Sequence, residues 1–120
     1  YPGLESLPQE ERAKRQMCDP KGRGAPGSMW YFVLKDGGTG TSVGARFVDH
    51  IAQHSYAISL AVSLGQIKTL IECPFSMTHA AVPQEEMIRR GVVPGGIRPS
   101  CGLEDWEDLV VDLEAALDAV

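Results

Sequence analysis

Four short apolar runs constrain the fold of this chain more than any other feature of its sequence. They span residues 28–34, 56–64, 67–73 and 97–101, and each ends at or near a glycine, a proline or a turn-forming segment. Their apolar, aromatic and β-branched residues are typical of strands, and the runs are far too short to cross a bilayer. We therefore expect four strands.

Helical patterns separate these runs. In the last pattern, which is the clearest, apolar residues repeat at helical spacing: Leu103, Trp106, Leu109, Val110, Leu113, Ala116, Leu117 and Val120. We also expect helices over about 6–17, around Val43 to Ile51, and over 84–90. Strands and helices mix without a strict βαβ rhythm. The order predicts one α+β domain over residues 1–120, with a small sheet covered by helices on one face.

Charge and cysteine usage exclude several classes of function. The net charge is −5 and the pI is about 5.1, which argues against a nucleic-acid partner because phosphate binding needs a basic face. We expect no membrane partner and see no secretion signal. Three cysteines without a C-x-x-C pattern indicate neither a metal site nor a disulfide framework, and favour a reducing, cytoplasmic location. His50 and His54 lack a third ligand at matching spacing, so we expect no metal.

Direct signs of catalysis are few, because the sequence holds no G-x-S-x-G, P-loop or G-x-G-x-x-G motif. We interpret residues 37–40 as a turn. Arg98 is more informative, since a charge among apolar and small strand residues needs an anionic partner. A carboxylate matches the guanidinium fork. The residues leave two alternatives open: the carboxylate of a ligand, or an internal salt bridge to an acid of the chain.

Several sequence blocks occur in a characteristic order. They are Tyr1 to Ser6, Pro8-Gln9, Ala13 to Met17, Ser63-Leu64-Gly65, Ser76 to Ala80, Arg98 to Gly102, Glu104-Asp105 and Asp108-Leu109. Together they resemble the C-terminal domain of the cysteine/methionine-metabolism (trans-sulfuration) family of pyridoxal-phosphate enzymes, in particular its methionine and cystathionine γ-lyases. The resemblance implies the C-terminal domain of a fold-type I enzyme, with a mainly antiparallel sheet.

The resemblance also implies a reaction. The intact enzyme would be a carbon–sulfur lyase of sulfur amino acids, splitting methionine or cystathionine by γ-elimination into a 2-keto acid, ammonia and a thiol. One alternative is a γ-replacing member, either an O-acylhomoserine sulfhydrylase or a cystathionine γ-synthase. Another is a stand-alone binding domain that kept the fold and lost the chemistry.

Four residues take substrate-binding roles by this resemblance. Arg98 would grip the substrate α-carboxylate, and Ser63 would lie beside it in the pocket. Val62 would help to set side-chain specificity, and its apolar character is nearer to methionine γ-lyase than to members with an acid at that position. Thr78 would border the pocket. For Ser63 and Thr78 the alternative is a hydrogen bond that only ties strand ends together.

The family holds pyridoxal phosphate and its Schiff-base lysine in a larger N-terminal domain. The four lysines of this chain, Lys14, Lys21, Lys35 and Lys68, match no such motif. We therefore expect this chain to hold no catalytic, cofactor-binding or metal-binding residue and to be inactive alone. The missing N-terminal domain and a homotetramer are the implied partners. Pro99 departs from the family pattern and removes a ladder donor, so we expect the strand at 97–101 to be an edge there.

Overall fold

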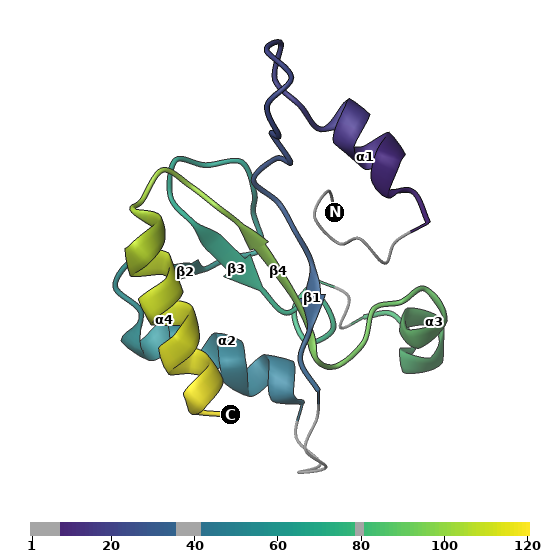
Figure 1. The fold of residues 1–120 in the computed structure, drawn as a ribbon. Coiled ribbons are helices and arrows are strands. Elements are labelled where there is room, and N and C mark those ends of the chain that lie inside the picture. The colour runs from purple at the N-terminus through teal and green to yellow at the C-terminus, as the bar shows by residue number, and fades with distance from the viewer. Residues whose placement is uncertain (1–7, 36–41, 79–80) are drawn as a thin grey trace.

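The computed structural model describes residues 8–35, 42–78 and 81–120, which form eight elements in the expected order (Figure 1). The bounds are α1 Glu10–Gln16, β1 Phe32–Val33, α2 Val43–His54, β2 Ser59–Leu60, β3 Leu70–Glu72, α3 Gln84–Arg89, β4 Gly96–Ser100 and α4 Trp106–Asp118. The blocks from Tyr1 to Ser6 and at His79-Ala80, and the predicted turn at 37–40, lie outside the described residues.

The four strands form one sheet in the order β1-β4-β3-β2. β4 pairs antiparallel with both β1 and β3, while β2 pairs parallel with β3. The sheet is therefore mainly antiparallel, and the prediction of a small mixed α+β fold is confirmed. The parallel β2–β3 pair has a functional consequence, because the chain leaves both strands at the same end of the sheet.

Two helices, α2 and α4, cover one face of this sheet (Figure 1). From α2, Phe47, Val48 and Ile51 are buried against Ile71 of β3 and Ile97 of β4. These residues carry the apolar pattern that predicted the helix, and burying that pattern stabilises it. By contrast, α1 buries none of its residues, and none of its described side chains belongs to this core.

Side-chain caps fix the N-termini of both covering helices. Ser42 caps α2 by accepting a hydrogen bond from the Ala45 amide, and it donates its own hydroxyl to the Pro94 carbonyl. Asp105 caps α4 by accepting from the Glu107 amide. Gly44 lets α2 approach the segment before β4 closely, because a Cβ atom there would lie 2.5 Å from the Pro94 carbonyl oxygen. Among the described residues, no helix is long and apolar enough to cross a membrane.

The edge-strand prediction at Pro99 is wrong, since β4 is interior, between β1 and β3. Trp30 donates its amide to the Pro99 carbonyl, so the backbone of Pro99 faces the β1 side. There the β1 pairing is interrupted: Phe32 and Val33 pair with β4, and Met29 makes only an isolated bridge to Ser100. In this register Trp30 lies opposite Pro99, and because Pro99 has no N–H the two residues share only the bond from the Trp30 amide to the Pro99 carbonyl.

Candidate functional site

The face of the sheet opposite α2 and α4 carries the predicted binding residue Arg98. Side chains alternate along a strand, so Arg98 and Ser100 point away from the core that holds Ile97. On the neighbouring strand Glu72 lies directly across from Arg98. The Arg98 Nη2 atom is 2.8 Å from Glu72 Oε1, with 28% of the Arg98 side chain exposed and 1% of that of Glu72.

This ion pair is the internal salt bridge that the sequence left open as one alternative for Arg98. Arg98 has an internal partner, and Glu72 satisfies the demand of a charge placed in the sheet. The ion pair leaves other N–H donors of Arg98 available, because a guanidinium carries five of them and the Arg98 side chain is partly exposed to solvent. Arg98 therefore combines a fixed position with an accessible charge, which is what recognition of an external carboxylate requires.

Apolar side chains surround Arg98 on this face. Met29, Tyr31 and Val33 of the β1 segment all lie on the Arg98 side, and each is about half exposed. The Tyr31 ring covers Gly96, because a Cβ atom on that glycine would meet the Tyr31 hydroxyl. The result is an accessible surface on which Arg98 lies among apolar groups.

The loop over residues 61–69 carries Val62 and Ser63 and has no helix or strand. It leaves the sheet after β2, and both side chains are exposed. The Gly65 amide then donates to the buried Ser100 hydroxyl oxygen at 3.0 Å. Since Ser100 and Arg98 project from the same face of β4, this bond brings the loop back toward the Arg98 side.

Thr78 reaches the same end of the sheet by another route. After β3 the chain turns, and the Met77 amide donates to the Cys73 carbonyl. Thr78 follows this turn and is exposed. Because β2 and β3 are parallel, the Val62–Ser63 segment and the turn before Thr78 leave the sheet together, near the Glu72–Arg98 pair.

A second anchor for the loop involves residues that the sequence reasoning missed. Thr69 donates its amide and its hydroxyl to the two carboxylate oxygens of Glu104, each at 2.7 Å. The Gly102 amide donates to the Thr69 hydroxyl oxygen at 2.8 Å. Burial raises the pKa of Glu104, but the Thr69 hydrogen bonds, with the charge of Lys68, outweigh burial and hold that pKa below its ordinary value.

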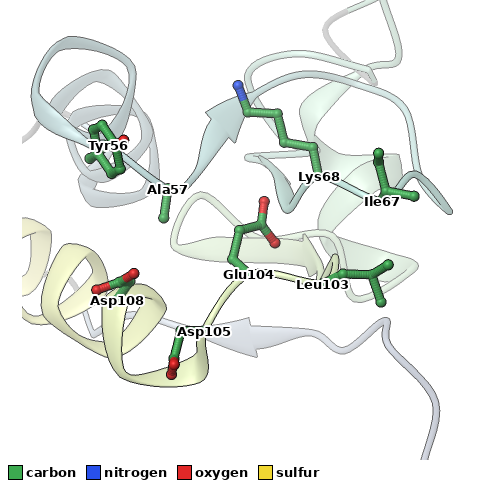
Figure 2. A pocket seen from close by; sticks show the side chains of 8 residues that line it. All are labelled: Tyr56, Ala57, Ile67, Lys68, Leu103, Glu104, Asp105 and Asp108. Atoms are coloured by element: carbon green, nitrogen blue, oxygen red, sulfur yellow. The ribbon is translucent and has the colours of Figure 1, made fainter.

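A hollow of about 650 Å³ lies on the outer side of this anchor (Figure 2). Its lining includes Tyr56, Ile67, Leu103 and Asp108, and none of the four predicted binding residues. Glu104 also lines it, yet both of its oxygens already accept from Thr69. We assign the hollow no part in the Arg98 site.

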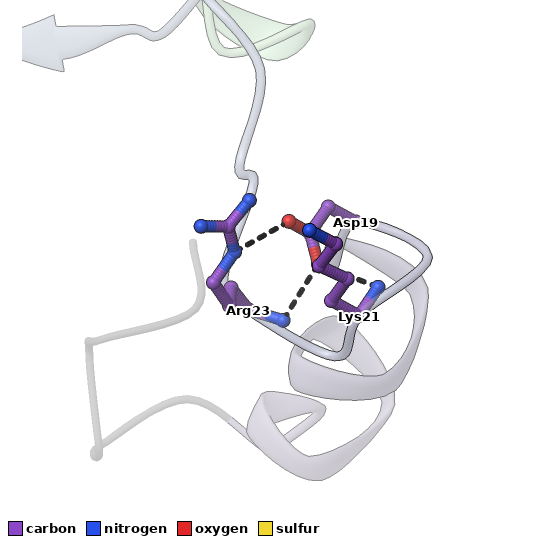
Figure 3. A network of polar contacts seen from close by, with 3 residues as sticks. All are labelled: Asp19, Lys21 and Arg23. Atoms are coloured by element: carbon purple, nitrogen blue, oxygen red, sulfur yellow. Dashed lines mark hydrogen bonds and ion pairs between the residues drawn. The ribbon is translucent and has the colours of Figure 1, made fainter.

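The second polar network is local. Asp19 accepts from the amides of Lys21 and Arg23 and from the Arg23 side chain, which closes the turn after α1 (Figure 3). The pKa of Asp19 is lowered, chiefly by the Arg23 backbone and side-chain hydrogen bonds. This network explains the charged segment after α1 as a self-contained turn.

None of the four lysines builds a cofactor cradle in the described part of the chain. Lys14 pairs with Glu10 and Glu11 on α1, and Lys68 lines the hollow of Figure 2. Lys21 and Lys35 are exposed. Among the described residues, no group of three His, Cys, Asp or Glu side chains gathers as metal ligands.

Comparison with known proteins gives one consistent result. Residues 1–118 match the family described as "Cys/Met metabolism PLP-dependent enzyme". The chain is 39% identical over 120 residues to L-methionine gamma-lyase of Porphyromonas gingivalis, covering 100% of this chain and 27% of that protein. The chain therefore spans about a quarter of the length of such relatives.

Solved structures agree. The fold matches cystathionine gamma-lyase from Lactobacillus plantarum complexed with L-serine, with a TM-score of 0.74 and 37% identity, over 100% of this chain and 28% of that one. It also matches cystathionine gamma synthase from Xanthomonas oryzae pv. oryzae in complex with cystathionine, with a TM-score of 0.71 and 37% identity, over 99% and 27%.

Proposed function

The chain belongs to the Cys/Met metabolism family of PLP-dependent enzymes, and from this premise we propose that it is the substrate-side domain of a carbon–sulfur lyase. The proposed reaction is γ-elimination from methionine or cystathionine, giving a 2-keto acid, ammonia and a thiol. Relatives named for γ-elimination, β-elimination and γ-replacement all match the chain, so the family by itself supports the substrate class and not one reaction.

The observation that carries the proposal is the setting of Arg98. Its guanidinium pairs with the buried carboxylate of Glu72 on the neighbouring strand and reaches solvent among apolar side chains. A sulfur amino acid offers a carboxylate for the guanidinium and an apolar thioether for the surroundings. Arg98 would orient the substrate by its carboxylate, and orientation of that kind contributes several kcal/mol to catalysis.

Pyridoxal phosphate is the cofactor that the family implies, and when bound it supplies an electron sink for the carbanion chemistry. The residues described here do not fit that group, because the lysines lie in surface pairs, in the Figure 2 hollow or on exposed segments. We propose that the Schiff-base lysine and the phosphate site belong to the remainder of the polypeptide, and that these 120 residues alone are inactive.

The loop residues refine the choice of substrate. Val62 is 55% exposed beside the exposed Ser63, so its isopropyl group can meet a ligand side chain without disturbing the core. We propose that Val62 favours the methyl thioether of methionine and that Ser63 and Thr78 hydrogen-bond the substrate. γ-Replacement on an acylated homoserine is the second candidate, and the fold match to a cystathionine γ-synthase favours keeping it.

The apolar surface around Arg98 also supports a partner. Half-exposed Met29, Tyr31 and Val33 would be covered by the remainder of the polypeptide, which in the relatives accounts for most of the length. We further propose a homotetramer for the intact enzyme and a cytoplasmic location, consistent with the three free thiols.

The test uses the longer polypeptide with bound cofactor. Methionine, cystathionine, and O-acetylhomoserine with a thiol are assayed side by side, in the parent protein and in the Arg98→Ala and Arg98→Lys variants. We expect activity on the first two substrates and a KM raised about a hundredfold by Arg98→Ala, the effect of losing a bidentate ion pair. Arg89→Ala, which removes an exposed arginine paired with Glu86, is the control and should leave KM unchanged. An unchanged KM in Arg98→Ala would remove the carboxylate-binding role.

A further inference from the structure

The loop that carries Val62 and Ser63 is tied to the connection between β4 and α4 by four hydrogen bonds, which we call the Glu104 clasp. Two of them join Thr69 to Glu104, through the amide and the hydroxyl. A third runs from the Gly102 amide to the Thr69 hydroxyl oxygen, and a fourth runs from the Leu103 amide to the Ile67 carbonyl at 2.8 Å. The clasp thus connects the end of the loop to the segment that follows β4.

The clasp matters because the loop has no regular structure of its own. Between β2 and β3 the backbone bonds from the Ala61 amide to the Ile71 carbonyl and from the Ser59 amide to the Thr69 carbonyl hold its two ends, and side-chain bonds hold it at Gly65–Ser100 and at the clasp. Thr69 is buried, and two bonds from one residue to both oxygens of a carboxylate fix orientation as well as distance. A loop that is anchored between its ends loses its conformational entropy on folding and not on ligand binding.

We propose that Glu104 is a positioning residue for the Arg98 site, acting through Thr69 on the loop that presents Val62 and Ser63. The inference rests on the proposed function, because it assigns the loop to the substrate. Glu104 does not contact the ligand in this scheme. It lies beyond the loop, on the side of the Figure 2 hollow, where Figure 2 shows its carboxylate near Lys68.

A purely structural role for Glu104 predicts a different behaviour. If the clasp only stabilised the fold, its loss would lower the amount of folded enzyme and leave KM and substrate preference unchanged. If the clasp positions the loop, its loss raises KM and weakens discrimination between substrate side chains, because Val62 no longer has one location.

The first experiment uses the 120-residue chain and amide hydrogen exchange. Glu104→Gln keeps the size of the side chain and removes its charge, and Glu114→Gln, on the exposed side of α4, is the matched control. We expect exchange of the Thr69 and Gly65 amides to accelerate about tenfold in Glu104→Gln, with the Phe47 amide of α2 unchanged. Equal acceleration at Phe47 would mean global unfolding and would overturn a local clasp.

The second experiment uses the longer polypeptide with bound cofactor. We expect Glu104→Gln to raise KM for methionine about tenfold, the effect of weakening one charge-assisted hydrogen bond, and to reduce the kcat/KM ratio between methionine and cystathionine toward one. Thr69→Val should have the same effect, whereas Thr69→Ser, which keeps the hydroxyl, should restore the parent values. The double variant should be no worse than either single variant, since both break one clasp.

The exchange experiment and the kinetic experiment together distinguish a failure of this inference from a failure of the proposed function. Faster exchange in the loop with unchanged KM and unchanged substrate ratio would overturn the positioning role and leave Arg98 in place. If no sulfur amino acid binds the parent protein, the proposed function fails. The exchange arm would then still decide whether Glu104 fixes the loop.

Discussion

Glu72 and Arg98 lie directly across from each other on β3 and β4, and their side chains form an ion pair of 2.8 Å on the face opposite the covering helices. The pair is asymmetric, because the carboxylate is buried while the guanidinium reaches solvent. Burial makes the Glu72 charge the more strongly desolvated of the two. That asymmetry leads to a test of stability.

Arg98→Ala should destabilise the chain by about 2–3 kcal/mol, because it removes an ion-pair partner of a buried carboxylate. The cost is below that of a fully buried pair because Arg98 is partly exposed. The double variant Arg98→Met with Glu72→Leu should recover most of the loss, since it removes both charges. Urea unfolding of the three proteins measures this. Arg90→Ala, which breaks an exposed pair with Glu86, should change the free energy of unfolding by less than about 1 kcal/mol. Equal losses in Arg98→Ala and Arg90→Ala would show that the burial of Glu72 adds nothing to the cost of removing Arg98.

The Glu104 clasp predicts a pH dependence. The pKa of Glu104 is lowered in the folded chain, so its contribution is present above the pKa of an unfolded glutamate and is lost as pH falls through the folded value. The stability difference between the parent chain and Glu104→Gln should therefore be largest near about pH 7 and shrink below about pH 4. Thermal unfolding across that range measures it. Because Asp19 and Glu86 also have lowered pKa values and are present in both proteins, they cancel in the difference.

Gly44 gives a packing test. A Cβ atom there would lie 2.5 Å from the Pro94 carbonyl oxygen and 2.9 Å from Cys73 Sγ, and the first contact is with backbone that cannot rotate away. Gly44→Ala should destabilise the chain by about 1–3 kcal/mol despite the better helix propensity of alanine. Gly24→Ala, where a Cβ atom meets nothing within 4 Å, is the control and should be close to neutral. A stabilised Gly44→Ala variant would show that α2 can shift away from the sheet.

The sequence predicted the order of all eight elements because apolar periodicity and Gly or Pro breaks are local signals. It overestimated the strands: the run at 56–64 became the two-residue strand Ser59–Leu60. Strand ends depend on where a neighbour is present, and Tyr56 is 94% exposed beyond the end of the sheet. The edge prediction for Pro99 failed for the same reason, because a local gap in a ladder cannot be read from one strand.

The candidate site was predicted less completely than the fold. Arg98 stands out in the sequence because a charge in an apolar strand needs a partner, and Glu72, an acid in the apolar run 67–73, carries the same signal. Thr69 and Glu104 gave no such signal, since a threonine and a glutamate at the start of an acidic helix are unremarkable locally. Their relation arises only when β3 and β4 pair and bring the two connections together.

Val62 offers a test of specificity that is separate from stability. The side chain is 55% exposed in a loop, so Val62→Glu should leave the unfolding midpoint of the chain nearly unchanged. In the longer polypeptide, an acid beside the substrate side chain should lower kcat/KM for methionine about tenfold or more, because an apolar thioether cannot compensate a partly desolvated carboxylate. Cystathionine, whose distal end carries an ammonium next to a carboxylate, should lose less because the ammonium can pair with the new acid, so the preference should move toward it. Val111→Glu is the matched control, since Val111 is 64% exposed on α4, which covers the opposite face of the sheet. Equal losses on both substrates in Val62→Glu would show that this position does not contact the substrate side chain.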